Sequence, residues 1–250
     1  MPIRARTLCN DMLNFARNQF TNILLLALLT ALISIVLSHV LSPGSEQLIT
    51  LSDGRHIDDT ANMSFQQRIQ HMSMEQQRIL LKASAANSLA GLIGDVLLVG
   101  GLLTMIRQVS NRHSISVLRA ICLSAPLFPR LLLLIFFTTL LVQLGLLLIV
   151  IPGIMLAIAF SLSPIIVTND NLSAIKSMRL SASLALANLR LLAPAVLVWL
   201  LAKSAILLLA TRFALVSPFV TAILLNGLSN LITILLLIYL YRLYMFLRQA

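Results

Sequence analysis

Charged residues are scarce in this chain of 250 amino acids. Asp, Glu, Lys and Arg together make up 10% of the residues, whereas a soluble domain contains about 25%. Hydrophobic residues make up 59%, which leaves too few polar residues to cover the surface of a chain of this size in water. The composition therefore excludes a soluble protein and indicates a membrane protein for which lipid is the main solvent.

Cysteine and the motifs of catalysis are nearly or wholly absent. Cys9 and Cys122 have no C-x-x-C or metal-ligand spacing, and both fall in segments that we assign to the cytoplasmic side, where thiols stay reduced. The four histidines are scattered over both sides without ligand spacing. The chain has no G-x-S-x-G, P-loop or G-x-G-x-x-G motif. We therefore expect no metal, no cofactor and no enzymatic activity.

Acidic residues are outnumbered by basic ones, 8 to 18, which gives a formal net charge of +10. In a soluble protein this excess would suggest nucleic acid as a partner. Here the bases lie in short segments between apolar runs, without interleaved aromatic residues. They are better explained as topology signals and as contacts to anionic headgroups. We expect the phospholipid bilayer, and not nucleic acid, to be the partner.

Six apolar segments approach the length that crosses a hydrocarbon core of about 30 Å. They span residues 20–41, 83–106, 131–150, 153–168, 191–210 and 219–241. The fourth is short, and we place helix breaks at Pro152, Gly153 and Pro164. The sequence thus predicts an all-α polytopic membrane protein of about six transmembrane helices in hairpin units, forming a single integral domain over residues 1–250.

Short helices with cationic residues are predicted at one face of the membrane. They lie in segments 2–18, 114–125 and 169–190, and we expect them to rest in the interface. Arg119, Lys176 and Arg179 are the candidates for contact with anionic lipid. After the last span, three tyrosines are typical of an interfacial aromatic belt, namely Tyr239, Tyr241 and Tyr244.

Residues 42–82 form the only long hydrophilic segment. Its first half is acidic and rich in turn residues, and its second half contains the capping-box patterns Ser64-x-x-Gln67 and Ser73-x-x-Gln76. We predict a periplasmic loop followed by one or two short helices, too small for an independent domain.

The distribution of Lys and Arg predicts the orientation. The segments that share a face with the N-terminus carry twelve of these bases, and the opposite segments carry five. Because positive charge favours the cytoplasmic side, both termini are expected in the cytoplasm.

A short repeat underlies the hairpin units. Residues 116–125 (SVLRAICLSA) align with residues 173–182 (SAIKSMRLSA), and each copy precedes a predicted membrane hairpin. The match covers ten residues, so it indicates either a true repeat or two serine-rich helices of similar composition.

Four segments are similar to a known family. MPIRARTLCNDMLNFARNQ, GLIGDVLLVGGLLT, SLSPIIVTN and YLYRLYMFLR together resemble the YciC family of enterobacterial inner-membrane proteins, over essentially the whole chain. The resemblance implies an integral protein of the Gram-negative inner membrane. It implies no particular activity, catalytic residue or cofactor.

Two charges, Asp95 and Lys203, fall inside predicted spans. A charge at mid-bilayer costs about 2.5–3.5 kcal/mol on insertion scales, so it usually finds a partner or water. Counted from the cytoplasmic edge their depths are similar, which leaves a structural pair, a proton or ion relay, and two unrelated placements as alternatives.

Two functions fit these observations. In the first, a non-enzymatic envelope component engages lipid, a membrane-protein partner or a second copy of itself. In the second, a small-molecule or ion transporter uses Asp95 and Lys203.

Overall fold

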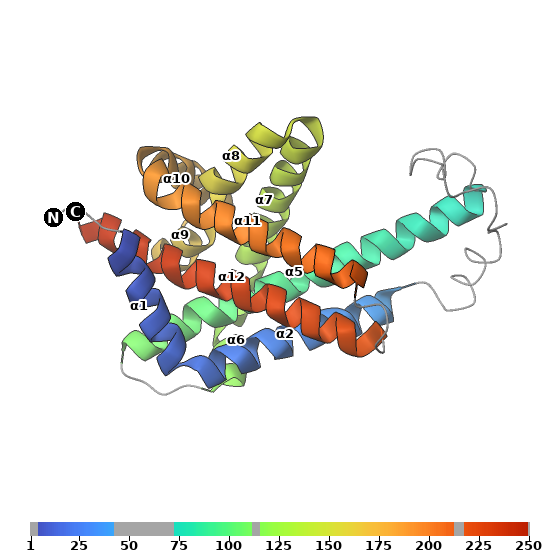
Figure 1. The fold of residues 1–250 in the computed structure, drawn as a ribbon, viewed down its shortest axis with the longest axis horizontal. Helices are drawn as coiled ribbons and strands as arrows, with labels where there is room; N and C mark the ends of the chain where they lie inside the picture. Colours follow the sequence, from blue (N-terminus) through green and yellow to red (C-terminus); the bar gives the residue numbers. More distant parts are fainter. Residues whose placement is uncertain (1–4, 43–72, 112–115, 213–217, 250) are drawn as a thin grey trace. The chain divides into compact units, whose positions relative to one another are not determined.

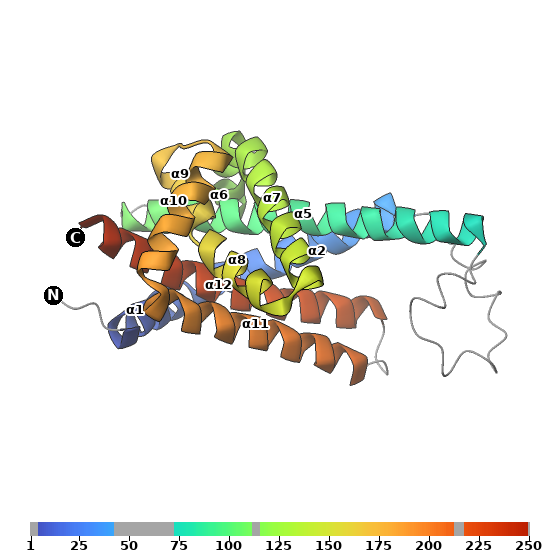
Figure 2. The ribbon, with the colours of Figure 1, turned by 90° about the horizontal axis from the view of Figure 1, so that it is seen from above.

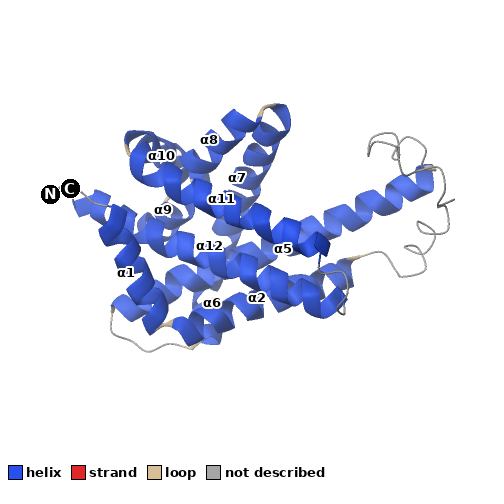
Figure 3. Cartoon of the chain, in the orientation of Figure 1, coloured by secondary structure: helices blue, strands red, loops and turns tan. Residues whose placement is uncertain are grey.

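Helices account for all regular structure in the part of the chain described by the computed structural model, residues 5–42, 73–111, 116–212 and 218–249 (Figures 1 and 3). This confirms the all-α class. The chain divides into two compact units. Unit 1 comprises Met1–Ile33 with Leu92–Ala250, and unit 2 comprises Ser34–Gly91. Each is described by itself.

Six helical segments among these residues are long and apolar enough to cross a membrane, as the sequence predicts. Helices suit this solvent because their backbone N–H and C=O groups are bonded within the segment. The segments are α2 (Phe20–Leu41), α5 (Met74–Ser110), α7 (Phe128–Leu148) with the short helices before it, α8 (Val150–Phe160) with α9 (Ser163–Asp170), α11 (Leu189–Arg212) and α12 (Pro218–Gln249).

Helix α5 is longer than the sequence predicts. Its N-terminus in unit 2 forms the expected capping box, because the Ser73 hydroxyl accepts from the Gln76 amide (3.2 Å) and Gln76 Oε1 accepts from the Ser73 amide (3.0 Å). No Pro or Gly separates Met74 from Ala90, so good helix formers carry one helix into the span without a break. The Ser64–Gln67 pattern and loop residues 43–72 lie outside the described residues.

Among the described residues, unit 2 also contains the end of α2. In this unit, the Ser38 hydroxyl of α2 donates to Asn87 Oδ1 of α5, at 3.2 Å.

Helices α7 and α8 form a hairpin with a one-residue connection. Ile149 adopts an extended conformation (φ −151°, ψ 133°), and Pro152 lies in the first turn of α8, where an N–H group has no partner to lose. Gly153 faces Gly145 and Leu146 so closely that a Cβ atom on Gly153 would lie 2.5 Å from the Leu146 amide nitrogen. The glycines therefore allow the two helix backbones to meet.

A second break separates α8 from α9. It lies at Ser161–Leu162, and Pro164 is the second residue of α9. Two hydroxyl groups cap the C-terminal end of α8: Ser161 donates to the Ile158 carbonyl (2.8 Å), and Ser181 donates to the Ala159 carbonyl (2.6 Å). The predicted fourth span is thus two helices, which end at the left-handed residue Asn171 (φ 51°).

Three short α-helices occupy the segments where the sequence predicts them: α1 (Ala5–Asn18), α6 (Val117–Ser124), followed by the 3₁₀ turn η1 (Ala125–Leu127), and α10 (Ala174–Ala187). Helix α1 lies beside α12 and α10 beside α8 and α9 (Figures 1 and 2). Helix α6 approaches α5, since Ser124 lies against Gly100. Their location in a membrane interface stays a prediction.

The C-terminal part of α12 holds several helix ends together. The Tyr244 hydroxyl donates to Asp170 Oδ2 at 2.5 Å, Arg248 forms a salt bridge with Asp170 at 3.0 Å, and the Tyr239 hydroxyl donates to the Leu191 carbonyl at 3.1 Å. All three tyrosines of this helix are buried, with exposures of 4–6%. The aromatic-belt interpretation is therefore wrong, because belt residues face the headgroups and these side chains face other helices.

Candidate functional site

A cavity of about 380 Å³ lies within unit 1, between the spanning helices. Its walls come from α5, α7, α8, α9, α11 and α12. Most of the lining is apolar, as expected in a membrane bundle, but eight side chains bring polar groups to it: Asp95, Thr138, Thr139, Gln143, Ser161, Trp199, Lys203 and Thr233. These groups come from far apart in the sequence and meet only in the folded bundle.

Asp95 supplies the only carboxylate of the cavity lining. It lies in the buried half of α5, between Gly94 and Val96, yet its own side chain is exposed. Among the described residues it has no hydrogen bond or salt bridge. A carboxylate at this depth is expensive without a partner, so its position favours contact with water or with a bound molecule.

Lys203 supplies the only ammonium group of this cavity lining, where it contacts an aromatic residue. Lys203 Nζ lies 4.7 Å from the centroid of the Trp199 ring, a cation–π contact that contributes about 0.5–2 kcal/mol. Trp199 Nε1 in turn donates to the Thr233 hydroxyl at 3.3 Å, and Thr233 donates to the Ser229 carbonyl at 3.0 Å. The ammonium position is thus supported by a chain of contacts from α11 to α12.

The structure brings the two charges of the sequence analysis into one cavity but not into direct contact. Asp95 and Lys203 both line it, and no salt bridge joins them in the described part of the chain. Opposite charges on one low-dielectric cavity attract each other even when separated. Whether they act as a structural pair or as a relay stays a prediction.

The other polar lining residues could not be identified from the sequence. From the sequence, Gln143 is interpreted as a residue that forms a hydrogen bond between helices. The Thr138 hydroxyl donates a hydrogen bond to the Leu134 carbonyl of its own helix (2.9 Å). Such residues are common in membrane helices. No spacing or motif separates Thr138, Gln143 and Thr233 from the polar residues outside the cavity.

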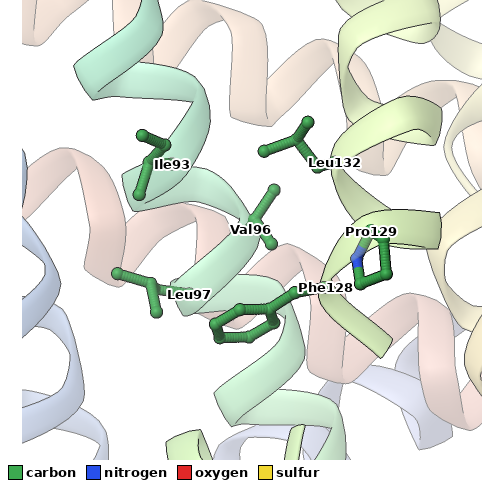
Figure 4. A pocket seen from close by; sticks show the side chains of 6 residues that line it. All are labelled: Ile93, Val96, Leu97, Phe128, Pro129 and Leu132. Atoms are coloured by element: carbon green, nitrogen blue, oxygen red, sulfur yellow. The ribbon is translucent and has the colours of Figure 1, made fainter. Parts of the chain in front are cut away.

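A second, smaller pocket of about 260 Å³ lies between α5 and α7 (Figure 4). All of its lining side chains are apolar: Ile93, Val96, Leu97, Phe128, Pro129 and Leu132. It offers no polar group for recognition, so the cavity with Asp95 and Lys203 is the better candidate site.

The three residues predicted to contact anionic lipid lie elsewhere in unit 1. Arg119 on α6 and Lys176 and Arg179 on α10 are exposed and do not line the cavity. Of the predicted helix-break residues, Pro164 lines the cavity, whereas Pro152 and Gly153 lie at the α7–α8 hairpin.

No cluster of three His, Cys, Asp or Glu side chains that could hold a metal occurs among the described residues. Cys9 and Cys122 are free and exposed.

A family model described as "Uncharacterised protein family (UPF0259)" matches residues 1–246. The chain belongs to this family. It is 77% identical to a UPF0259 membrane protein of Sodalis glossinidius over 250 residues, covering all of both chains. It is 52% identical to that of Serratia proteamaculans, again over all of both chains, and 51% identical to that of Pectobacterium carotovorum over 99% of this chain and all of the relative. No solved structure matches. The resemblance to a family of enterobacterial membrane proteins is confirmed.

Proposed function

We propose that this UPF0259 protein is a non-enzymatic membrane protein that binds a small amphipathic molecule of the membrane in the cavity of Asp95 and Lys203. The observation that carries the proposal is the lining itself. Ligand cavities are about 300–1,000 Å³ and mostly apolar, with a few polar groups that converge, and this cavity of about 380 Å³ has that composition.

The two charged side chains in the cavity also favour ligand binding. Intramembrane ionisable residues are costly and mark binding sites or pathways by default. A carboxylate and an ammonium group without a direct salt bridge can each contact a charged group of a ligand, while the apolar walls accept its hydrocarbon part. The lining has neither His nor Cys, and hydroxyl groups such as that of Thr138 already bond to backbone carbonyls, which supports binding over catalysis.

The test compares the molecules that co-purify with the protein. Asp95→Asn and Lys203→Met remove one charge each from the cavity, while Asp11→Asn and Lys82→Met remove the same charges from exposed positions outside it. Mass spectrometry of purified protein should show an amphipathic molecule in wild type and both controls, reduced about tenfold or more in either cavity variant. An identical set of bound molecules in all five proteins would refute the proposal.

Transport is a second candidate, favoured by the break between α8 and α9. Transporters often form their sites at interrupted helices near the midplane, and here Ser161 and Pro164 of the break line the cavity. Combining Asp95→Asn with Lys203→Met separates a structural pair from a relay. If the charges form a pair, each single change destabilises the protein and the double change recovers much of the loss. A relay predicts a stable double variant that moves no ions in proteoliposomes.

The location and orientation of the protein are also part of the proposal. We place the protein in the bacterial inner membrane, as its resemblance to enterobacterial inner-membrane proteins implies, with both termini in the cytoplasm, because Lys and Arg concentrate in the segments on that side. The bilayer is then its principal partner, and its exposed apolar helices are available to a second copy or another membrane protein.

A further inference from the structure

Helices α6 and α10 are equivalent in structure as well as in sequence. Each begins after a serine in the extended conformation, Ser116 (φ −76°, ψ 152°) and Ser173 (φ −68°, ψ 155°). Adding 57 to the number of each buried residue of α6 gives a buried residue of α10. The three pairs are Val117 and Ala174, Ala120 and Ser177, and Ser124 and Ser181. The two copies therefore present the same face to the bundle.

Their outward faces are also equivalent, and they are unusual. Leu118 of α6 is 65% exposed and its counterpart Ile175 of α10 is 73% exposed. Next to them, the bases Arg119 and Lys176 are exposed as well. Five residues further along each helix, Leu123 of α6 and Leu180 of α10 form a second pair of exposed apolar residues. Helices of water-soluble surfaces turn polar residues outward, whereas large apolar residues beside bases are typical of helices that lie in a membrane interface.

A hydrogen bond joins the segment that follows α6 to the segment that precedes α10. Arg130, in the first turn of α7 and just after α6, donates to the carbonyl of Asn171 at 3.5 Å. Asn171 lies between the end of α9 and the start of α10. The end of the α6 segment therefore lies close to the start of α10, and exposed bases lie next to these helices at Arg130 and within α10 at Arg179. This concentration of positive charge complements an anionic surface.

We propose that α6 and α10 are repeat-related anchors that dock on the anionic headgroup layer of the membrane. Leu118 and Ile175 enter the boundary between headgroups and acyl chains, and Arg119 and Lys176 contact headgroup phosphates. The occupant of these faces is the lipid surface, because a membrane-spanning bundle brings that surface to them. The proposal concerns a different surface from the cavity and does not depend on ligand binding there.

The first test measures depth. In a background with Cys9→Ala and Cys122→Ala, single cysteines at Leu118, Ile175 and the control position Met74 (80% exposed, in unit 2) carry an environment-sensitive fluorophore. The protein is reconstituted in phosphatidylcholine–phosphatidylglycerol vesicles. Labels at 118 and 175 should be quenched to the same extent by a nitroxide just below the headgroups and should resist aqueous iodide, unlike the label at 74. Iodide access equal to that at 74, or unequal depths at 118 and 175, would overturn the proposal.

The second test removes the charge of the bases and replaces them with glutamine, an uncharged side chain of similar length, and measures the retention of anionic lipid. Arg119→Gln with Lys176→Gln should weaken retention of phosphatidylglycerol by about thirtyfold, since each base near an anionic surface contributes about 1 kcal/mol, or about fivefold. The matched control is Arg78→Gln with Lys82→Gln, which should retain the lipid as wild type does. Equal retention by both double variants, each monodisperse in size-exclusion chromatography, would refute the role of these bases.

Discussion

Replacing Gly153 by alanine tests the closeness of the α7–α8 hairpin. The new Cβ atom would lie 2.5 Å from the Leu146 amide nitrogen and 2.7 Å from the Leu146 Cα, and backbone atoms cannot move aside as a flexible side chain can. Alanine gains about 1 kcal/mol of helix propensity over glycine, while overpacking costs about 1–3 kcal/mol and more where the backbone must shift. We expect a net destabilisation of about 2 kcal/mol.

A matched control is available in α5. A Cβ atom on Gly91 would have no neighbour within 4 Å, so Gly91→Ala keeps the propensity gain and has no steric cost. Unfolding in detergent can be followed by the fluorescence of the single tryptophan, Trp199. The midpoint should fall for Gly153→Ala and stay or rise for Gly91→Ala. If Gly153→Ala is as stable as wild type, the helices are not held at the distance that the structure shows.

Three further outcomes are expected. Tyr244→Phe should cost about 1.5–3 kcal/mol of unfolding free energy, because it removes a hydrogen bond to a partly buried carboxylate. Arg248→Met should cost less than about 1 kcal/mol, because that side chain is 60% exposed. Equal shifts of the two variants in the same unfolding assay would contradict this ranking. Asn230→Leu should cost about 0.6–1.7 kcal/mol, since its side-chain amide donates to Ala27 and Thr30 of α2, and no change in the midpoint would show these bonds to be dispensable. Reporter fusions after Asn171 should report cytoplasm and a fusion near Gly54 periplasm, and a cytoplasmic signal at residue 54 would reverse the topology.

The spanning helices could be predicted because apolar length alone determines them in lipid. Segment 20–41 coincides with α2. The prediction failed where two helical segments join, since continuity depends on single residues. The absence of Pro and Gly before Ala90 made α5 continuous. The division between α8 and α9, by contrast, lies next to Pro164, where the sequence analysis places a helix break, and the hydroxyl groups of Ser161 and Ser181 cap α8 there.

Of the polar residues that line the candidate site, the sequence could single out only the two charged ones. Asp95 and Lys203 stand out because an ionisable residue in an apolar run is rare. Gln143 and Thr233 do not, because which face of a membrane helix meets a cavity is decided by packing across several helices. The buried tyrosines of α12 show the same limit, since an aromatic residue near a helix end can face either lipid or protein.

The contacts of the last turns of α12 have a consequence for the order in which the bundle assembles. Tyr239 and Tyr244 bind the start of α11 and the end of α9, and Arg242 lies over the Phe15 ring of α1 at 5.9 Å. These three residues are synthesised after the first five spans, so the contacts cannot form before α12 has been made. Until then the carboxylate of Asp170 lies at the negative C-terminal end of a helix dipole without its partners Tyr244 and Arg248. The first five spans alone therefore lack the contacts by which α12 joins α1, α9 and α11, and these contacts form only after α12 has been added.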